Sequence, residues 1–233
     1  MTKRYIRHAS ELVTCKGQAP KRGKEMSDIG LIEDGGVLIH DDKIFAVGTT
    51  EELDKMISPD EYEIIDATGK TVLPGFVDSH THFVFGGYRA DEFTWRLKGD
   101  SYMSIMERGG GINATINPTK NATEEELVAV GRERLNRMLE FGVTTVEGKS
   151  GYGMDCETEL KQLRAMKELD KIHPVDIVTT FLGPHSVLPQ YKGKEREFID
   201  MMINEVMPKV KAEDLAEFAD IFCEKGVFNI EDS

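Results

Sequence analysis

Most of the sequence after Pro74-Gly75 alternates between short apolar segments and longer amphipathic ones. The apolar segments are rich in β-branched residues and predict strands at 76–82, 143–146, 176–182 and 219–223. The amphipathic segments repeat with the helical period and predict helices at 123–141, 158–172 and 195–210. Because strand–helix alternation builds parallel βαβ units, the sequence predicts an α/β fold.

Local signals place the ends of two of these helices. Thr123 and Glu126 have the spacing of a capping box, and Gly142 stands where a helix-ending glycine belongs. Pro208 falls near the end of segment 195–210, and we expect it to disturb the last turn of that helix.

Two closures of the parallel sheet are open at this point, a doubly wound sheet and a (β/α)8 barrel. A complete barrel needs about 250 residues, whereas only 163 residues follow residue 70. About four strands are expected there, and no helix is expected after the last of them. These features predict a half-barrel truncated at Ser233, or else an open sheet.

Residues 1–70 predict a different kind of structure, made of short strands and turns. Segments 35–39 and 43–48 flank a turn at Asp41-Asp42 and have the composition of a β-hairpin. We therefore divide the chain into a β-rich unit at 1–70 and an α/β unit at 71–233.

The charge balance limits the classes of partner. The chain has 29 basic and 42 acidic residues, for a formal net charge of −13, and such a field repels nucleic acid and anionic membranes. No signal peptide or transmembrane segment is recognised, and Cys15, Cys156 and Cys223 are too far apart for a thiolate zinc site. We expect a cytoplasmic protein with reduced thiols and neither nucleic acid nor membrane as a partner.

Two histidines at the end of the first α/β strand are the strongest chemical signal. Asp78, His80 and His82 are two residues apart, so their side chains share one face of a strand. Solvated histidine pairs are common, and a His-x-His pair alone says little. Here the pair stands at the end of an apolar strand in a βαβ pattern. In barrel enzymes, polar residues at the carboxyl end of such a strand are catalytic. We therefore predict that His80 and His82 bind a divalent metal ion.

The run from Leu73 to His82 resembles the first barrel strand of the amidohydrolase superfamily. Enzymes of this superfamily hold one or two metal ions with such a His-x-His pair. They combine a (β/α)8 barrel with a small β-sandwich built from both chain ends. The resemblance implies a partial TIM barrel at 71–233 and the N-terminal part of a β-sandwich at 1–70.

Further motifs resemble the imidazolonepropionase family, and the resemblance covers the whole chain. Five motifs occur in the family's order: Phe85-Gly86-Gly87-Tyr88-Arg89 with Glu92-Phe93, Gly109-Gly110-Gly111-Ile112, Glu147-Gly148-Lys149-Ser150-Gly151-Tyr152-Gly153, Thr180-Phe181-Leu182-Gly183-Pro184-His185, and Asp220-Ile221-Phe222-Cys223-Glu224. The resemblance implies hydrolysis of the ring C–N bond of 4-imidazolone-5-propanoate to N-formimidoyl-L-glutamate, in histidine degradation, by a homodimer.

Four residues are expected at the substrate. Arg89 follows the metal pair, and its guanidinium suits a carboxylate tail, although a surface arginine would look the same in the sequence. Tyr152 lies on a glycine-rich loop after the second strand, where a tyrosine often only covers the loop. His185 follows the third strand and resembles the family's substrate-polarising histidine, so we assign it a catalytic role. Tyr102 resembles another substrate contact with weaker support.

The implied chemistry is metal-assisted hydrolysis with one zinc or iron ion per complete site. Family members add a histidine and an aspartate as metal ligands and a glutamate as acid or base, all from later strands. No histidine follows His185 in this chain. We therefore expect the isolated chain to bind metal weakly and not to turn over.

Two other interpretations remain open. One is a different cyclic-amide hydrolase, related to hydantoinase or dihydroorotase, in which a carboxylated lysine such as Lys225 bridges two metals. The other is a non-catalytic fragment.

The tripeptide Gly148-Lys149-Ser150 resembles the end of a phosphate-binding loop, but the upstream Gly142 is one residue too far away. We instead expect Lys149 to order the loop that carries Tyr152.

Overall fold

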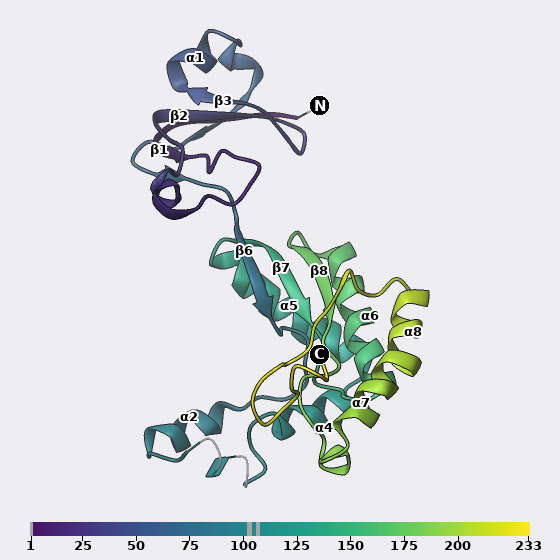
Figure 1. Cartoon of the computed structure of the whole chain (residues 1–233). Coiled ribbons are helices and arrows are strands. Elements are labelled where there is room, and N and C mark those ends of the chain that lie inside the picture. The colour runs from purple at the N-terminus through teal and green to yellow at the C-terminus, as the bar shows by residue number, and fades with distance from the viewer. Residues whose placement is uncertain (1, 102–103, 106–107) are drawn as a thin grey trace. The chain divides into compact units, whose positions relative to one another are not determined.

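The computed structural model describes residues 2–101, 104–105 and 108–233. The chain forms two compact units, Met1–Pro74 and Gly75–Ser233 (Figure 1). The first is a β-rich unit and the second is a mixed α/β unit. Their assignment to a β-sandwich and a barrel stays a prediction.

The N-terminal unit is built on one five-stranded mixed sheet. Its strands are β1 (Lys3–Val13), β2 (Leu31–His40), β3 (Lys43–Thr49), β4 (Glu63–Asp66) and β5 (Thr71–Val72). The order is β3-β2-β1-β4, and β5 pairs with β1. The predicted hairpin is confirmed, since β2 and β3 pair antiparallel around Asp41, which has a φ of 53°.

Strands β1 and β2 are longer than the short strands that the sequence predicted. Their pairing is irregular between Ile6 and Ala9, where His8 has a φ of 59°. Asp34 on the facing strand has a φ of 46°, and its carboxylate lies 2.9 Å from the His8 ring. A bulge of this kind bends a strand without ending it, which explains the greater length.

Helix α1 (Thr50–Asp54) was not predicted, although its signal is in the sequence. Thr49 and Glu52 form a complete capping box at its start. Its Leu53 is buried with Tyr5, Leu38 and Tyr62 in one of the two apolar clusters of this unit.

The second unit contains a four-stranded parallel sheet. Its strands are β6 (Phe76–Thr81), β7 (Val143–Lys149), β8 (Asp176–Phe181) and β9 (Phe218–Ala219), in the order β6-β7-β8-β9. All three pairings are parallel, as strand–helix alternation predicted (Figure 1). The unit is thus a mixed α/β structure with a half-barrel sheet.

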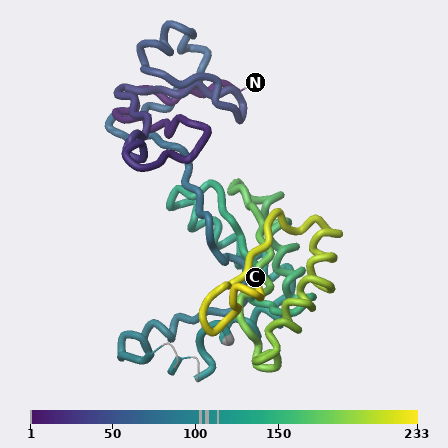
Figure 2. Tube along the Cα trace, in the orientation of Figure 1, coloured from purple at the N-terminus to yellow at the C-terminus, as the bar shows by residue number. Residues whose placement is uncertain are grey.

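The predicted fourth strand at 219–223 is wrong in extent, because β9 ends at Ala219. The Asp220 amide still donates to Phe181 O, but the Asp220 carboxylate accepts the next amide, that of Ile221. This local bond turns the chain out of the sheet. The Phe222 amide then donates to Pro184 O, which joins the C-terminal segment, yellow in Figure 2, to the loop after β8.

Two long helices cover the face of the sheet that carries Val146. They are α5 (Glu124–Glu140) and α6 (Cys156–Ile172), both close to their predicted limits. The Thr123–Glu126 capping box is confirmed, and Gly142 follows α5 with a φ of 86°. Val146 is fully buried with Leu135 of α5 and Met166 of α6, so this core fixes which face of β7 points away from the helices.

The predicted helix 195–210 is interrupted. It consists of α7 (Glu195–Met201), a π-helical segment Met202–Val206 and α8 (Met207–Ala212). Pro208 has no amide proton to continue the α-helical ladder, and the wider turn precedes it. Helices α2 (Ala90–Leu97) and α4 (Asn113–Asn121) were not predicted. Among the described residues, no helix has the length and apolarity to cross a membrane.

Candidate functional site

The histidine pair lies at the carboxyl end of β6. His80 belongs to the strand and His82 follows it directly, with 6.3 Å between their ring centroids. The Asp78 carboxylate accepts the His80 amide at 3.2 Å, which fixes the backbone next to the pair. Both imidazoles therefore start from one strand end, as the spacing predicted.

His185 and Tyr152 come to His82 from two other strand ends. The rings of His82 and His185 are stacked, with centroids 4.6 Å apart and an interplanar angle of 8°. The Tyr152 ring lies 4.9 Å from His82 and 5.4 Å from His185. Tyr152 follows β7 and His185 follows β8, so the ends of three adjacent strands bring these rings together.

Burial keeps both stacked imidazoles neutral. It lowers the pKa of His82 to about 3, and the neighbouring His185, His80 and Lys149 add to this effect. Burial also lowers the pKa of His185, whose Nδ1 donates to the backbone oxygen of Gly151 at 3.0 Å. Neutral imidazoles have a free electron pair, which is the form that binds metals and accepts protons.

The donor atoms fit part of a metal site. His82 Nδ1 is buried and has no hydrogen-bond partner among the described residues. An imidazole nitrogen in this state is suited to a zinc or iron ligand. Within the described ranges, no group of three or more His, Cys, Asp or Glu side chains could hold a metal ion. His80 and His82 can thus supply two ligands, and a catalytic site commonly has three protein ligands.

Lys149 has a different role from the one expected. Its ammonium group lies 2.6 Å from Glu147 Oε1 and 3.0 Å from Asp220 Oδ2, and its side chain is only 5% exposed. The Thr180 hydroxyl also donates to Glu147 Oε1, at 2.5 Å. Lys149 therefore ties β7 to the segment after β9 and does not order the Tyr152 loop.

Two residues of α6 hold that loop instead, and the sequence did not identify them. Glu159 and Gln162 are fully buried, and they accept the amide protons of residues 151–154. The sequence pattern could have indicated their burial, because Glu159 and Gln162 fall on the same face of the helix as the buried Leu163 and Met166.

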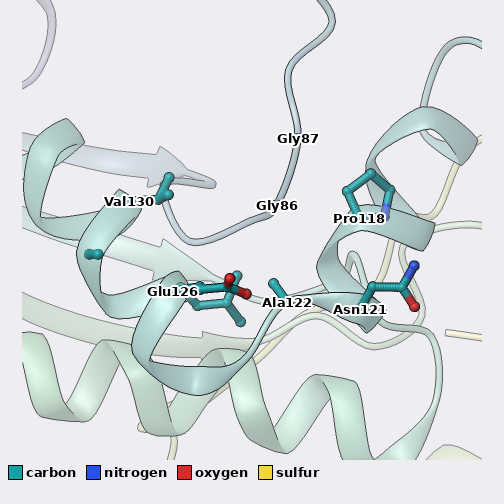
Figure 3. Close-up of a pocket in the computed structure, with 9 residues that line it drawn as sticks. Gly86, Gly87, Pro118, Asn121, Ala122, Glu126 and Val130 are labelled. Atoms are coloured by element: carbon teal, nitrogen blue, oxygen red, sulfur yellow. The ribbon is translucent and has the colours of Figure 1, made fainter.

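Of the other two predicted residues, the structure describes only Arg89. Arg89 is exposed and precedes α2, and its charge contributes to lowering the pKa of His185. Tyr102 lies outside the described residues. A pocket of this unit lies between the loop after β6 and helices α4 and α5 (Figure 3). It is lined by Gly86, Gly87, Pro118, Asn121, Ala122, Glu126, Leu127, Ala129 and Val130, none of which is a predicted site residue.

Curated relatives match the whole chain. The Amidohydrolase family matches residues 63–120. An imidazolonepropionase of Parabacteroides distasonis is 54% identical over 232 residues, which cover 100% of this chain and 56% of the relative. An imidazolonepropionase of Clostridium tetani is 53% identical over 228 residues, which cover 98% and 54%. The chain thus spans about half the length of the curated relatives it matches, and the resemblance predicted from the motifs is confirmed.

Solved structures share the fold at low identity. Guanine deaminase of E. coli matches with a TM-score of 0.59 and 16% identity, over 100% of this chain and 48% of that chain. Atrazine chlorohydrolase of Arthrobacter aurescens TC1, solved in complex with zinc, matches with a TM-score of 0.51 and 17% identity, over 92% and 45%.

Proposed function

We propose that this chain, which corresponds over its whole length to the N-terminal part of imidazolonepropionases, supplies half of an active site that opens the ring of 4-imidazolone-5-propanoate. The product is N-formimidoyl-L-glutamate, formed by hydrolysis of a ring C–N bond. One observation carries the proposal: His82, Tyr152 and His185 meet at the ends of three adjacent parallel strands. Side chains at this edge of such a sheet carry the chemistry in barrel enzymes.

His80 and His82 would hold the metal ion, zinc or iron. When bound, such an ion polarises the scissile amide and makes a water molecule acidic enough to attack near neutral pH. The Nδ1 of His82 has no hydrogen-bond partner in the part of the chain that the structure describes, and the pKa of this ring is lowered; both support this role, since a ligating imidazole must be deprotonated. The zinc in the atrazine chlorohydrolase structure is compatible with this choice.

Three side chains would orient the substrate. The Arg89 guanidinium would pair with the propanoate carboxylate. Tyr152 would contact the planar imidazolone ring from the loop after β7. His185 uses Nδ1 for Gly151 O, which leaves its Nε2 for the reacting end of the ring. Tyr102 is proposed as a further contact.

The proposed fold of the complete enzyme is a (β/α)8 barrel with a small β-sandwich. Strands β6 and β9 are the two outer strands of the described parallel sheet, and further strands of a barrel would pair with them. Those strands would also bring the remaining metal ligands. The 233-residue chain alone is therefore expected to bind metal weakly and to be inactive. A cytoplasmic location and a homodimer stay predictions.

The interpretation as a hydantoinase or dihydroorotase relative is less well supported. It needs a bridging lysine at the end of the fourth strand, but Lys225 lies six positions beyond the end of β9 at Ala219. Lys149, whose charge contributes to the lowered pKa of His82, is already paired with two carboxylates.

A substrate comparison tests the proposal. The gene product in its natural length is loaded with zinc or iron and supplied in turn with 4-imidazolone-5-propanoate, dihydroorotate and a hydantoin. Turnover of the imidazolone alone is the expected result. Preference for dihydroorotate or hydantoin would support the alternative hydrolase, and no turnover of any of the three would support a non-catalytic fragment.

A further inference from the structure

The loop that carries Tyr152 has an unusual internal support. The amide groups of residues 151–154 are four consecutive donors in the loop between β7 and α6. All four end on side chains of one helix, α6. The Glu159 carboxylate accepts the amides of Gly151, Gly153 and Met154 at 2.9, 2.8 and 2.8 Å, and Gln162 Oε1 accepts that of Tyr152 at 3.2 Å.

Glu159 is buried without any cation as a partner in the described contacts. Its residue is 0% exposed, and burial by itself raises the pKa of its carboxyl. Hydrogen bonds from three amides and the Ser150 hydroxyl lower the pKa in turn, but the pKa of this carboxyl remains raised. Burying a carboxylate is costly unless donors satisfy it, so these contacts constrain the loop to a single conformation.

Gly151 connects the Glu159 carboxylate to the His185 ring by two hydrogen bonds. Gly151 donates its amide to Glu159, and its carbonyl oxygen accepts Nδ1 of His185 at 3.0 Å. Because a carbonyl only accepts, His185 Nδ1 must have the proton, which fixes which ring nitrogen is left for a ligand. Gly151 has a φ of 110°, and a Cβ there would lie 2.9 Å from His185 Cβ and Nδ1. The imidazole therefore packs directly on this peptide.

Gln162 connects the same loop to the segment that follows His82. Its Nε2 donates to Val84 O at 2.7 Å while its Oε1 accepts the Tyr152 amide. Glu159 and Gln162, three residues apart on one helix, thus contact the loop that carries Tyr152 and the segment that follows His82, and Gly151 links them to His185.

We infer that Glu159 is a positioning residue, which sets the orientation of Tyr152 and His185 by holding the Gly151–Met154 loop. The expected effect on turnover rests on the proposed function, whereas the expected effects on the loop and on the His185 ring do not. Glu159 does not touch the substrate; it acts through Gly151 on the ring that does.

The test uses Glu159→Gln in the gene product of natural length, with Glu157→Gln as the matched control. Both residues are glutamates in the first turn and a half of α6, but Glu157 is exposed. A glutamine at 159 keeps the shape and replaces one acceptor oxygen by an NH2 group that faces amide donors. Because this variant could fail to fold, Glu159→Asp is measured beside it as the conservative change.

Three readouts are combined. Amide hydrogen exchange among residues 151, 153 and 154 should speed up about 10-fold or more in Glu159→Gln, since one acceptor oxygen is replaced by a donor and the remaining amide oxygen is an uncharged, weaker acceptor. In Glu159→Gln, nitrogen NMR of the histidine rings should show that the His185 proton is no longer held on Nδ1. For turnover of 4-imidazolone-5-propanoate, kcat should fall on the order of 100-fold with a smaller change in KM, because a displacement of about 1 Å is enough. Glu159→Asp should show a smaller change than Glu159→Gln in each readout, and Glu157→Gln should behave as the parent.

The outcomes separate the two proposals. If the parent protein does not act on the imidazolone, the proposed function fails, while exchange and NMR still decide the role of Glu159. If the parent is active and Glu159→Gln keeps its kcat, its His185 signal and its loop protection, the positioning role is overturned. A uniform loss of stability with an unchanged His185 signal would also overturn it, because that is what a purely structural residue would give.

Discussion

His82 and His185 lie with their imidazole rings parallel, 4.6 Å apart at their centroids and 8° apart in plane. The two residues follow different strands, β6 and β8, which are separated in the sheet by β7. Both residues are partly buried, and burial is the largest cause that lowers the pKa of each ring. The stack therefore places two neutral imidazoles where the proposed reaction needs a ligand and a substrate contact.

Metal binding should depend on His82. We expect His82→Asn to abolish the weak zinc binding of this chain, since it removes one of two imidazole ligands. The measurement is zinc content per chain after dialysis, with His8→Asn as the control, because His8 lies in the other unit at a positive φ that asparagine tolerates. Equal zinc in both variants would contradict the assignment.

Arg89 should act on substrate binding. In the gene product of natural length, Arg89→Met is expected to raise KM for 4-imidazolone-5-propanoate roughly 10- to 100-fold with little change in kcat, because a charged hydrogen bond to the carboxylate is lost. Arg96→Met, also exposed and in the following helix, is the control. An unchanged KM for Arg89→Met would remove Arg89 from the site.

Gly151 should tolerate no side chain. Gly151→Ala forces a Cβ to within 2.7 Å of Leu182 O and 2.9 Å of the His185 ring, so we expect His185 to shift and turnover to fall on the order of 100-fold. Gly193→Ala is the matched control, because Gly193 has a φ of 78° but a Cβ added there would meet no atom within 4 Å. Comparable losses in both variants would mean that backbone strain alone is responsible.

Lys149 should be important for stability. Lys149→Met leaves the carboxylates of Glu147 and Asp220 together without their cation, and we expect the free energy of unfolding to fall by about 3 kcal/mol. Urea denaturation gives this value. Lys167→Met, which breaks the more exposed pair with Glu217, should cost less than about 1 kcal/mol. Similar losses in the two variants would show that burial of the Lys149 pairs adds nothing.

The N-terminal unit should lose stability in alkali through Tyr5. Burial first, and then the hydrogen bond to Asp54, raise the pKa of Tyr5 from 10.0 to about 12. The neutral phenol is favoured in the folded state, so this stability is complete below the unfolded pKa and is lost as the pH rises through the folded one. Urea unfolding at about pH 9 and about pH 11 should show a smaller loss in Tyr5→Phe than in the parent or in Tyr191→Phe. If the free energy of unfolding falls equally between the two pH values in the parent and in Tyr5→Phe, Tyr5 is not responsible for the loss.

Local sequence determined the elements that have strong local signals. The Thr123–Glu126 capping box and Gly142 set both ends of α5, and the βαβ alternation gave the parallel sheet. The spacing of His80 and His82 was enough to place both imidazoles at one strand end, because side-chain direction along a strand alternates with a fixed period. The motifs around them also identified the related family.

Tertiary structure decided what depends on contacts between distant segments. The sequence could not show that Lys149 pairs with Asp220 or that Glu159 supports the Tyr152 loop, because such partners are chosen only when strands and helices pack. The path of the chain after β9 was also decided by a distant contact, the hydrogen bond from the Phe222 amide to Pro184 O. The stack of His82 on His185 exists because parallel strands bring their carboxyl ends to one edge of the sheet. Burial at that edge lowers the pKa of both rings.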